Sequence, residues 1–281
     1  AYEIMPSLVG SEMCIRDSQY DLRSVESLVE RVLDFLEKEE MVKREKKLIT
    51  ATKFGELVSR LYIDPLSGVV LRDGLMGVSR KKPTDLALLH LVCHTPDMPK
   101  FYLGRKEDER FEMLTNEHAR EFLVPIPEDP DEHEFFLAEL KTAYMLRSWL
   151  EEVPEDLIHE EFGIGAGDIR RSVETAAWLI HAAHELSRLF KIKHAMTPLR
   201  KLGKRIRYGV KEELLDLVRL QGVGRVRARN LFKAGYRKLE DIKRSTEREL
   251  ASVPAIGSEM ARSIKRQVEG SLGQAPFPRG V

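Results

Sequence analysis

The sequence lacks the features that define several classes of protein. It has only 2 cysteines in 281 residues, which excludes a disulfide framework and favours a reducing compartment. No apolar run approaches the ~18 residues that a transmembrane helix needs. No Gly-x-x-x-x-Gly-Lys-Ser/Thr loop is present, so the chain cannot hold a nucleoside triphosphate by that mechanism. We therefore expect a soluble, cytoplasmic protein without a membrane partner.

The chain has no net charge, yet its charges are separated along the sequence. Residues 1–190 carry 24 basic and 37 acidic side chains, whereas residues 191–281 carry 22 basic and 9 acidic ones. The last third is therefore a strongly basic module attached to an acidic body. Such a module indicates a polyanionic partner, with nucleic acid as the first candidate.

The first 18 residues differ from everything after them. They have no helical or strand periodicity, and the string from Gly10 to Ser18 looks like translated sequencing-adapter sequence. We expect residues 1–18 to be non-native, in which case Cys14 has no role and the native chain continues upstream of residue 19.

Periodicity predicts a mostly α fold with three domains. A helix behind a Ser24 N-cap, a hairpin with a basic wing within Met41 to Thr52, and a helix from about Lys53 indicate a winged helix over residues 19–82, although other helix-turn-helix variants share this order. Residues 83–203 are helical with short breaks, as in a helical bundle. Its longest helix should begin at an Asp168 N-cap and continue to about Phe190.

Residues 204–281 contain two similar units about 33 residues apart, each a helix, a glycine turn and a helix. The first turn contains Gly222 and Gly224, and the second contains Gly257. Glycines let the backbone approach a phosphate, and the free amides of the following helix donate to it. The first turn is followed by three basic residues that add charge, namely Arg225, Arg227 and Arg229. The alternative is that the glycines only allow two helices to cross tightly.

Two further groups of residues have competing interpretations. Arg171 and Trp178 are seven residues apart, so they share one helix face and could stack on the bases of a single strand, or Trp178 could belong to the core. His90, Cys93 and His94 could place metal ligands on one face, but no second ligand group accompanies them, so we predict no metal site. The sequence shows no nucleophile and base pair, and we predict no catalytic residue.

Four ordered segments carry a resemblance to a known family: Ala51 to Leu66, Leu88 to Met98, Gly167 to Arg171 with Trp178, and Leu220 to Arg229. Over about residues 22–270 the chain resembles the archaeal superfamily 2 DNA repair helicases, which are relatives of the helicase portion of DNA polymerase theta. Those helicases have two RecA-like motor domains, then a winged helix that packs against the motor, a helical ratchet bundle and a helix-hairpin-helix domain. The resemblance implies that this chain contains the last three domains.

The resemblance also implies roles for individual residues. Arg171 and Trp178 match the ratchet pair that contacts the translocating strand, while Gly222, Gly224 and the arginines after them grip it. The parent enzyme would unwind forked DNA from 3′ to 5′ in replication-coupled repair, with ATP and Mg²⁺ bound in its motor domains. Without the motor, this chain should need no cofactor and should neither hydrolyse ATP nor unwind DNA. The alternative is a stand-alone, non-enzymatic DNA-binding or protein-docking module.

Overall fold

The structure is a computed structural model that describes residues 22–45, 48–77, 82–104 and 106–270. The segment 1–18, which we expect to be non-native, lies outside these ranges, as does Cys14. The chain divides into two compact units, residues 1–69 and 70–281.

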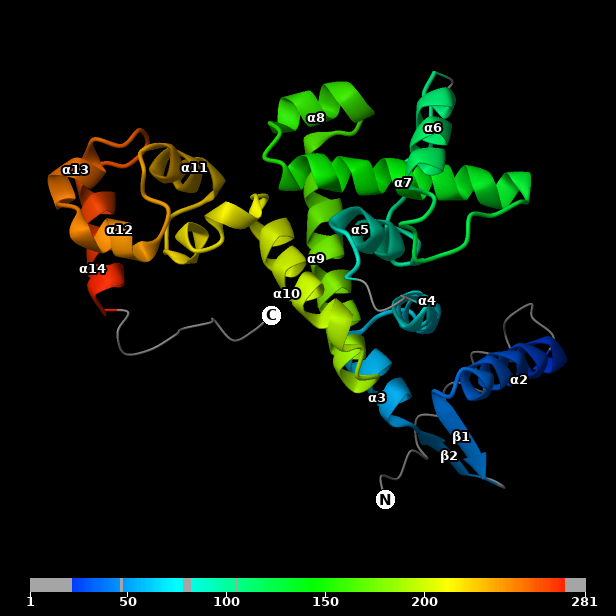
Figure 1. The fold of residues 1–281 in the computed structure, drawn as a ribbon. Helices are drawn as coiled ribbons and strands as arrows, with labels where there is room; N and C mark the ends of the chain where they lie inside the picture. Colours follow the sequence, from blue (N-terminus) through cyan, green and yellow to red (C-terminus); the bar gives the residue numbers. More distant parts are fainter. Residues whose placement is uncertain (1–21, 46–47, 78–81, 105, 271–281) are drawn as a thin grey trace. The chain divides into compact units, whose positions relative to one another are not determined.

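The described part of the first unit has the order that the sequence predicts, helix, hairpin and helix, but the first helix already includes Ser24, so the prediction of Ser24 as its N-cap is wrong. α2 (Leu22–Lys38) precedes the antiparallel strands β1 (Val42–Glu45) and β2 (Leu48–Ala51), in which Val42 pairs with Ala51 (Figure 1). α3 (Lys53–Leu61) follows, and its N-cap residue Thr52 accepts a hydrogen bond from the Gly55 amide. α4 (Pro65–Met76) begins in this unit and crosses the division between the two units.

Within this first unit, Arg44 of the predicted basic wing is paired with α2. The Arg44 guanidinium in β1 contacts the carboxylates of Glu30, Asp34 and Glu37, which lie along α2. Gly55 lies directly against the Met41 carbonyl oxygen, where a Cβ would come within 2.1 Å, so only glycine fits at this position.

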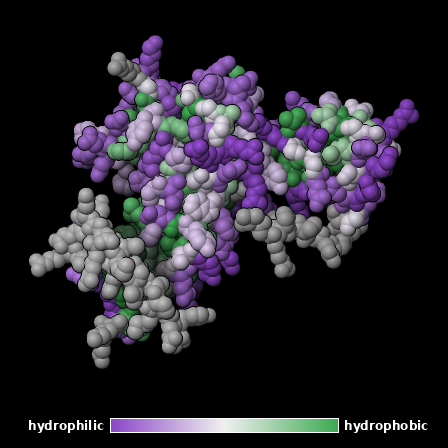
Figure 2. Space-filling view, turned by 180° about the vertical axis from the view of Figure 1, so that it is seen from behind, coloured by the Kyte–Doolittle hydropathy of each residue, from purple (hydrophilic) through white to green (hydrophobic). Residues whose placement is uncertain are grey.

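The second unit contains a helical bundle built around α5 (Asp85–Cys93), whose residues from Leu86 to Cys93 are all buried. α6 (Asp108–His118), α7 (Pro130–Leu150), α8 (Glu155–Phe162), α9 (Ala166–Leu189) and α10 (Lys193–Tyr208) complete it. α9 runs across α7 and packs along α10 (Figure 1). The face seen in Figure 2 is mainly hydrophilic, with small apolar patches.

The start of α9 corrects one prediction. Asp168 is not the N-cap residue, because the Gly165 carbonyl already accepts hydrogen bonds from the amides of Asp168 and Ile169, at 3.0 and 2.9 Å. The helix therefore begins at Ala166, with Gly165 as N-cap. Asp168 lies in the first turn, where a carboxylate still interacts favourably with the helix dipole.

The C-terminal part of this unit is a small helical module with its own core. It comprises η1 (Glu212–Leu214), η2 (Leu217–Arg219), α11 (Arg225–Lys233), α12 (Leu239–Arg244), α13 (Glu247–Ala251) and α14 (Ser258–Gly270). Its first hairpin is preceded by the short 3-10 turn η2 rather than by an α-helix. α10 ends at Tyr208 with a left-handed Gly209, so the expected domain boundary between residues 203 and 204 falls inside this helix.

Candidate nucleic-acid interface

The first hairpin turn leaves backbone amides open to an anion. Gly222 has φ +79°, and a Cβ there would come within 2.9 Å of the Met260 Cε. Gly224 is the N-cap residue of α11, and nothing lies within 4 Å of the place its Cβ would take. The first amides of a helix have no intrahelical acceptor and form the positive end of its dipole. A phosphate can therefore approach this turn closely.

The second hairpin turn repeats the first. Ala255 takes the place of Gly222, with φ +64°, and Gly257 takes the place of Gly224, again with open space at its Cβ position. In both turns the amide of the residue between these two positions donates a 3.0 Å hydrogen bond to the carbonyl three residues back. A left-handed conformation costs a residue with a Cβ about 1–2 kcal/mol. The second turn therefore has the same conformation as the first, at a conformational cost at Ala255.

Arg227 holds the two turns together. Its Nη1 donates to the Gly222 carbonyl at 2.7 Å, and its Nε donates to the Ala255 carbonyl at 2.9 Å. The side-chain amide of Asn230 adds a 2.9 Å hydrogen bond to the Pro254 carbonyl. The guanidinium of Arg227 is thus used to position the turns, which is a structural role that sequence reasoning did not separate from DNA contact.

Arg225 contacts the helical bundle. Its guanidinium carbon lies 4.4 Å from the centroid of the Trp149 ring, which belongs to α7. Its Nη2 is 3.9 Å from a carboxylate oxygen of Glu155. Trp149 in turn donates from its indole nitrogen to the Ile206 carbonyl at 2.8 Å, which links α7 and α10. Arg225 therefore docks the hairpin module onto the bundle.

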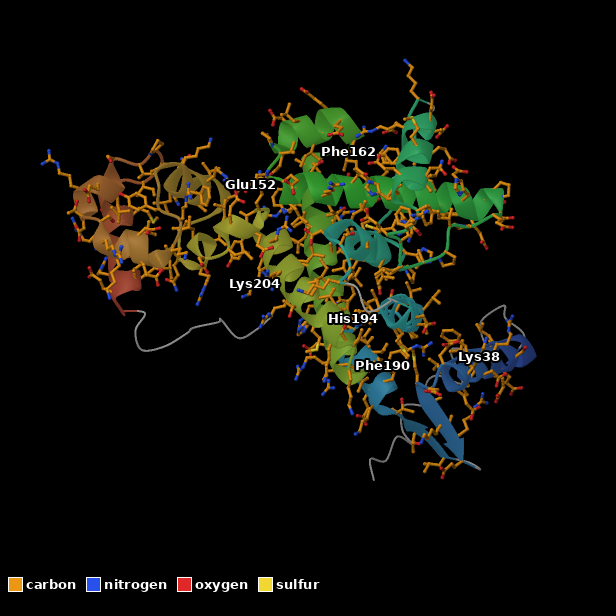
Figure 3. The ribbon with its side chains drawn as sticks, viewed as in Figure 1. Lys38, Glu152, Phe162, Phe190, His194 and Lys204 are labelled. Atoms are coloured by element: carbon orange, nitrogen blue, oxygen red, sulfur yellow. The ribbon has the colours of Figure 1, made fainter. Side chains whose placement is uncertain are left out.

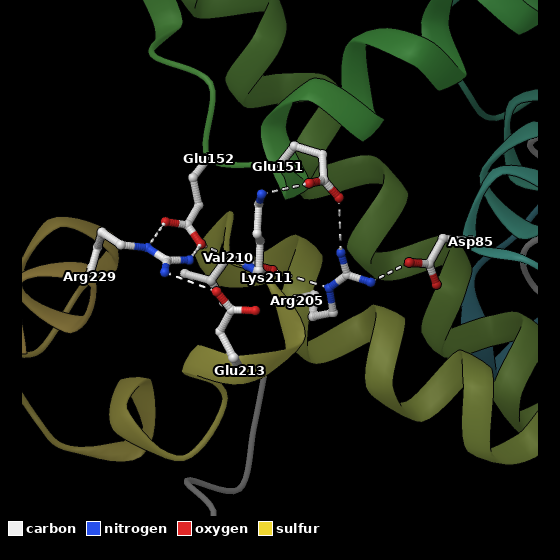
Figure 4. Close-up of polar contacts among 8 residues, drawn as sticks. All are labelled: Asp85, Glu151, Glu152, Arg205, Val210, Lys211, Glu213 and Arg229. Atoms are coloured by element: carbon white, nitrogen blue, oxygen red, sulfur yellow. Dashed lines mark hydrogen bonds and ion pairs between the residues drawn. The ribbon is translucent and has the colours of Figure 1, made fainter. Parts of the chain in front are cut away.

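Arg229 makes the strongest contact between the hairpin module and the bundle (Figure 4). Its Nε and Nη2 donate to the two carboxylate oxygens of Glu152 at 2.7 and 2.6 Å, and its Nη1 donates to Glu213 at 2.9 Å. The Lys211 amide also donates to Glu152, at 3.0 Å. The hydrogen bond to Glu152 raises the pKa of Arg229. Burial disfavours the Glu152 carboxylate, but the hydrogen bonds from Arg229 and Lys211 outweigh it and lower the pKa of Glu152.

A second ion-pair group lies beside this one (Figure 4). Arg205 is buried in α10, contacts the Asp85 carboxylate at the start of α5, and donates from Nε to the Val210 carbonyl at 3.2 Å. Its Nη2 lies 3.7 Å from Glu151, which also pairs with the Lys211 ammonium at 3.0 Å. Sequence reasoning missed this group because its partners come from separate parts of the chain.

The two ratchet candidates lie on one face of α9. The side chain of Arg171 is 75% exposed, and its only ion pair among the described residues is a 3.8 Å contact with Asp168. Trp178 is half-buried. Two helical turns separate them, a rise of about 10 Å along the axis. Stacking on DNA by this pair remains a prediction, as do DNA contacts by the three arginines of the hairpin module.

His90 belongs to the core. It is fully buried between the rings of Phe122 and Phe136, with centroids at 4.7 and 4.4 Å, and burial lowers its pKa to about 3. His94 instead pairs with Glu139 at 2.7 Å. No group of three or more metal-ligating side chains occurs within the described residues. Across the same residues, no helix is long and apolar enough to cross a membrane.

Comparison with known proteins agrees with this organisation. Residues 86–209 match the family described as archaeal helicase, domain 4, and residues 214–269 match the SAM-like helix-hairpin-helix tandem. These two ranges coincide with the helical bundle up to Gly209 and with the module that carries the two hairpin turns.

Relatives extend the match over most of the chain. The ATP-dependent DNA helicase Hel308 of Methanocella arvoryzae is 40% identical over 263 residues, which are 92% of this chain and 35% of the relative. Proteins of the same name from Thermococcus kodakarensis and Caldivirga maquilingensis are each 36% identical, over 92% and 87% of this chain and 23% and 33% of their own lengths. The chain thus spans roughly a quarter to a third of the curated relatives it matches. The chain thus contains the archaeal helicase domain 4 and a helix-hairpin-helix tandem, and over most of its length it is similar to part of the DNA helicases named Hel308.

Proposed function

We propose that this chain is the strand-guiding accessory part of an ATP-dependent 3′–5′ DNA helicase that acts on forked DNA in replication-coupled repair. The observation that carries the proposal is the repeated turn geometry at Gly224 and Gly257, where two helix N-termini present open amides in one module. Such N-termini bind phosphates through free N–H groups and the helix dipole. The name of the relatives, ATP-dependent DNA helicase, supports DNA as the polyanion.

In this proposal the long helix α9 supplies a second contact. The exposed guanidinium of Arg171 and the indole of Trp178 stack on the bases of the passing single strand, at ~1–3 kcal/mol per stacked base. Stacking of this kind holds the strand between steps of the motor, so that the strand moves in one direction only. ATP and Mg²⁺ bind in RecA-like motor domains outside this chain, which are its partners in the complete enzyme.

The test is a fluorescence-anisotropy titration of the whole 281-residue chain with single-stranded and forked DNA over a salt series. Gly224→Asp places a carboxylate at the N-cap of α11, where Asp stabilises a helix but repels a phosphate. Gly224→Asn is its matched control, because Asn caps equally well without the charge. We expect the Asp variant to bind about fivefold more weakly in ~0.1 M salt, the loss of roughly one phosphate contact, and the Asn variant to bind nearly normally.

The ratchet pair is tested in the same titration with Arg171→Ala/Trp178→Ala. Loss of one stacked base should weaken binding by about 5-fold to 150-fold. Arg170→Ala is the control, since its side chain is 83% exposed and lies on another face of α9. If the double variant binds DNA as tightly as the unmodified chain and binding is still salt-sensitive, Trp178 is a core residue and does not contact DNA. A chain that does not bind DNA at all would refute the proposed function.

A stand-alone DNA-binding or protein-docking module is the second candidate. The half-buried Trp178 and the intramolecular contacts of Arg225 and Arg229 favour it. In that case a soluble quencher should leave much of the tryptophan fluorescence intact, and DNA should give no further protection.

A further inference from the structure

α10 presents a basic face that neither the hairpin turns nor the ratchet pair uses. Its 16 residues include no acidic side chain. Its buried residues are Arg205 and four apolar residues that pack toward α9 and the bundle, namely Ala195, Leu199, Leu202 and Ile206. Everything that α10 contributes to the core therefore comes from one side, and the other side is open to solvent.

Basic residues fill the open side at helical spacing. Lys193, Arg200, Lys204 and Arg207 lie at positions i, i+7, i+11 and i+14, which place them on one face. With a rise of 1.5 Å per residue, the row is about 21 Å long. Figure 3 shows Lys204 on the side of α10 that faces away from α7. We call these four residues the α10 basic face.

Three residues of the α10 basic face, Lys193, Arg200 and Arg207, keep their charges free of acidic partners in the part of the chain that the structure describes. Arg205, on the opposite side, is the arginine that the fold uses, through Asp85 and Glu151. No ion pair joins Lys193, Arg200 or Arg207 to an acidic group within the described ranges. Three positive charges on one helix face without an acidic partner raise the local concentration of a polyanion.

We propose that the α10 basic face binds the phosphate backbone of a single nucleic-acid strand. The proposal rests on the proposed function and adds a contact surface to it. A protein partner fits less well, because protein interfaces have an apolar centre, and the residue between the charges on this face is Thr197. The helix leads through Gly209 into the module with the hairpin turns, so one strand could reach both surfaces.

The experiment uses the whole chain with Arg200→Glu/Arg207→Glu. The matched control is Lys106→Glu/Arg120→Glu, which makes the same change in net charge at two exposed residues elsewhere in the second unit. Affinity for a fluorescent single-stranded DNA, and for RNA of the same sequence, is measured over a salt series. Circular dichroism checks that both variants remain folded.

Each phosphate contact contributes about 0.7 to the slope of log affinity against log salt for a single strand. Loss of two contacts should therefore reduce the slope by about 1.4 and weaken binding about 25-fold in ~0.1 M salt. The control should keep the wild-type slope. If the substitutions weaken binding of DNA but not of RNA, the ligand of this face is DNA. If they weaken binding of DNA and RNA equally, the face contacts only the phosphate backbone.

Equal losses in the variant and its control would mean that only overall charge matters and would overturn the proposal. Normal binding by the α10 variant, with weakened binding by Gly224→Asp, would also overturn it while leaving the proposed function intact. The face would then be open to an acidic protein surface. Absence of DNA binding by the unmodified chain would overturn both proposals.

Discussion

The contact between Arg229 and Glu152 allows a quantitative prediction about how firmly the hairpin module is held. The perturbation is a double-mutant cycle of Glu152→Gln, Arg229→Gln and the double variant. Each substitution removes one charge; Glu152→Gln also keeps the shape of the side chain, whereas Arg229→Gln shortens it. The cycle isolates the interaction between the two residues from their other contacts.

The magnitude follows from the geometry of the pair. Two hydrogen bonds of 2.6 and 2.7 Å join side chains that are 11% exposed for Glu152 and 20% exposed for Arg229. A hydrogen bond to a charged group contributes about 1.5–3 kcal/mol, whereas an exposed ion pair contributes about 0.2–1 kcal/mol. Because Arg229 keeps its bond to Glu213 and some solvent reaches the pair, we expect a coupling energy of about 2 kcal/mol.

The assay is urea unfolding of the four proteins, followed by circular dichroism at neutral pH. A coupling energy below about 0.5 kcal/mol would place the pair among screened surface contacts and refute the reasoning. The sign of the pH dependence gives a second check. The pKa of Glu152 is lowered by folding, so its contribution is complete above the unfolded value of about 4.3 and is lost as the pH falls through the folded value. Glu152→Gln should remove that loss.

Two other substitutions test the packing of the bundle. Gly209→Ala should lower the melting temperature far more than Gly163→Ala, because both glycines have positive φ but only at Gly209 would a Cβ meet a side chain, 2.5 Å from the Trp149 ring; equal shifts would contradict this. The buried His90 has its pKa lowered to about 3, so stability should fall as the pH drops from about 6.5 toward that value, since the unfolded chain takes up the proton first. His90→Leu should abolish this dependence, and a stability curve unchanged by the substitution would contradict the burial.

Local patterns predicted the elements of this protein well. The wing between α2 and α3 and the glycine turns at Gly222 and Gly257 follow from residues that are neighbours in sequence. The start of α9 was misplaced because Asp168 is a good N-cap residue, while the turn actually begins at Gly165, whose extended backbone needs no side-chain cap. Such an error is local and shifts the N-cap by three residues, from Asp168 to Gly165.

The partners of the arginines could not be predicted in this way. The sequence predicted that Arg225 and Arg229 add positive charge to a phosphate site, because the residues around them are basic. Their actual partners, Trp149 and Glu152, precede them by more than 70 residues and become neighbours only when the module packs on the bundle. The row of basic residues on α10 was readable from spacing, but only burial shows which arginine of that helix is turned inward.

The contacts of Arg225 and Arg229 have a mechanical consequence. The backbone joins the hairpin module to α10 only through Gly209 and the residues after it, and one covalent connection does not by itself fix the orientation of a module. The stacked Arg225 and Trp149 and the paired Arg229 and Glu152 form a second attachment beside it, anchored at the end of α7. A force on a nucleic-acid strand bound at the hairpin turns would therefore be transmitted to the bundle through two connections. The load would be shared by α7 and α10, and the module would not rotate about the connection at Gly209.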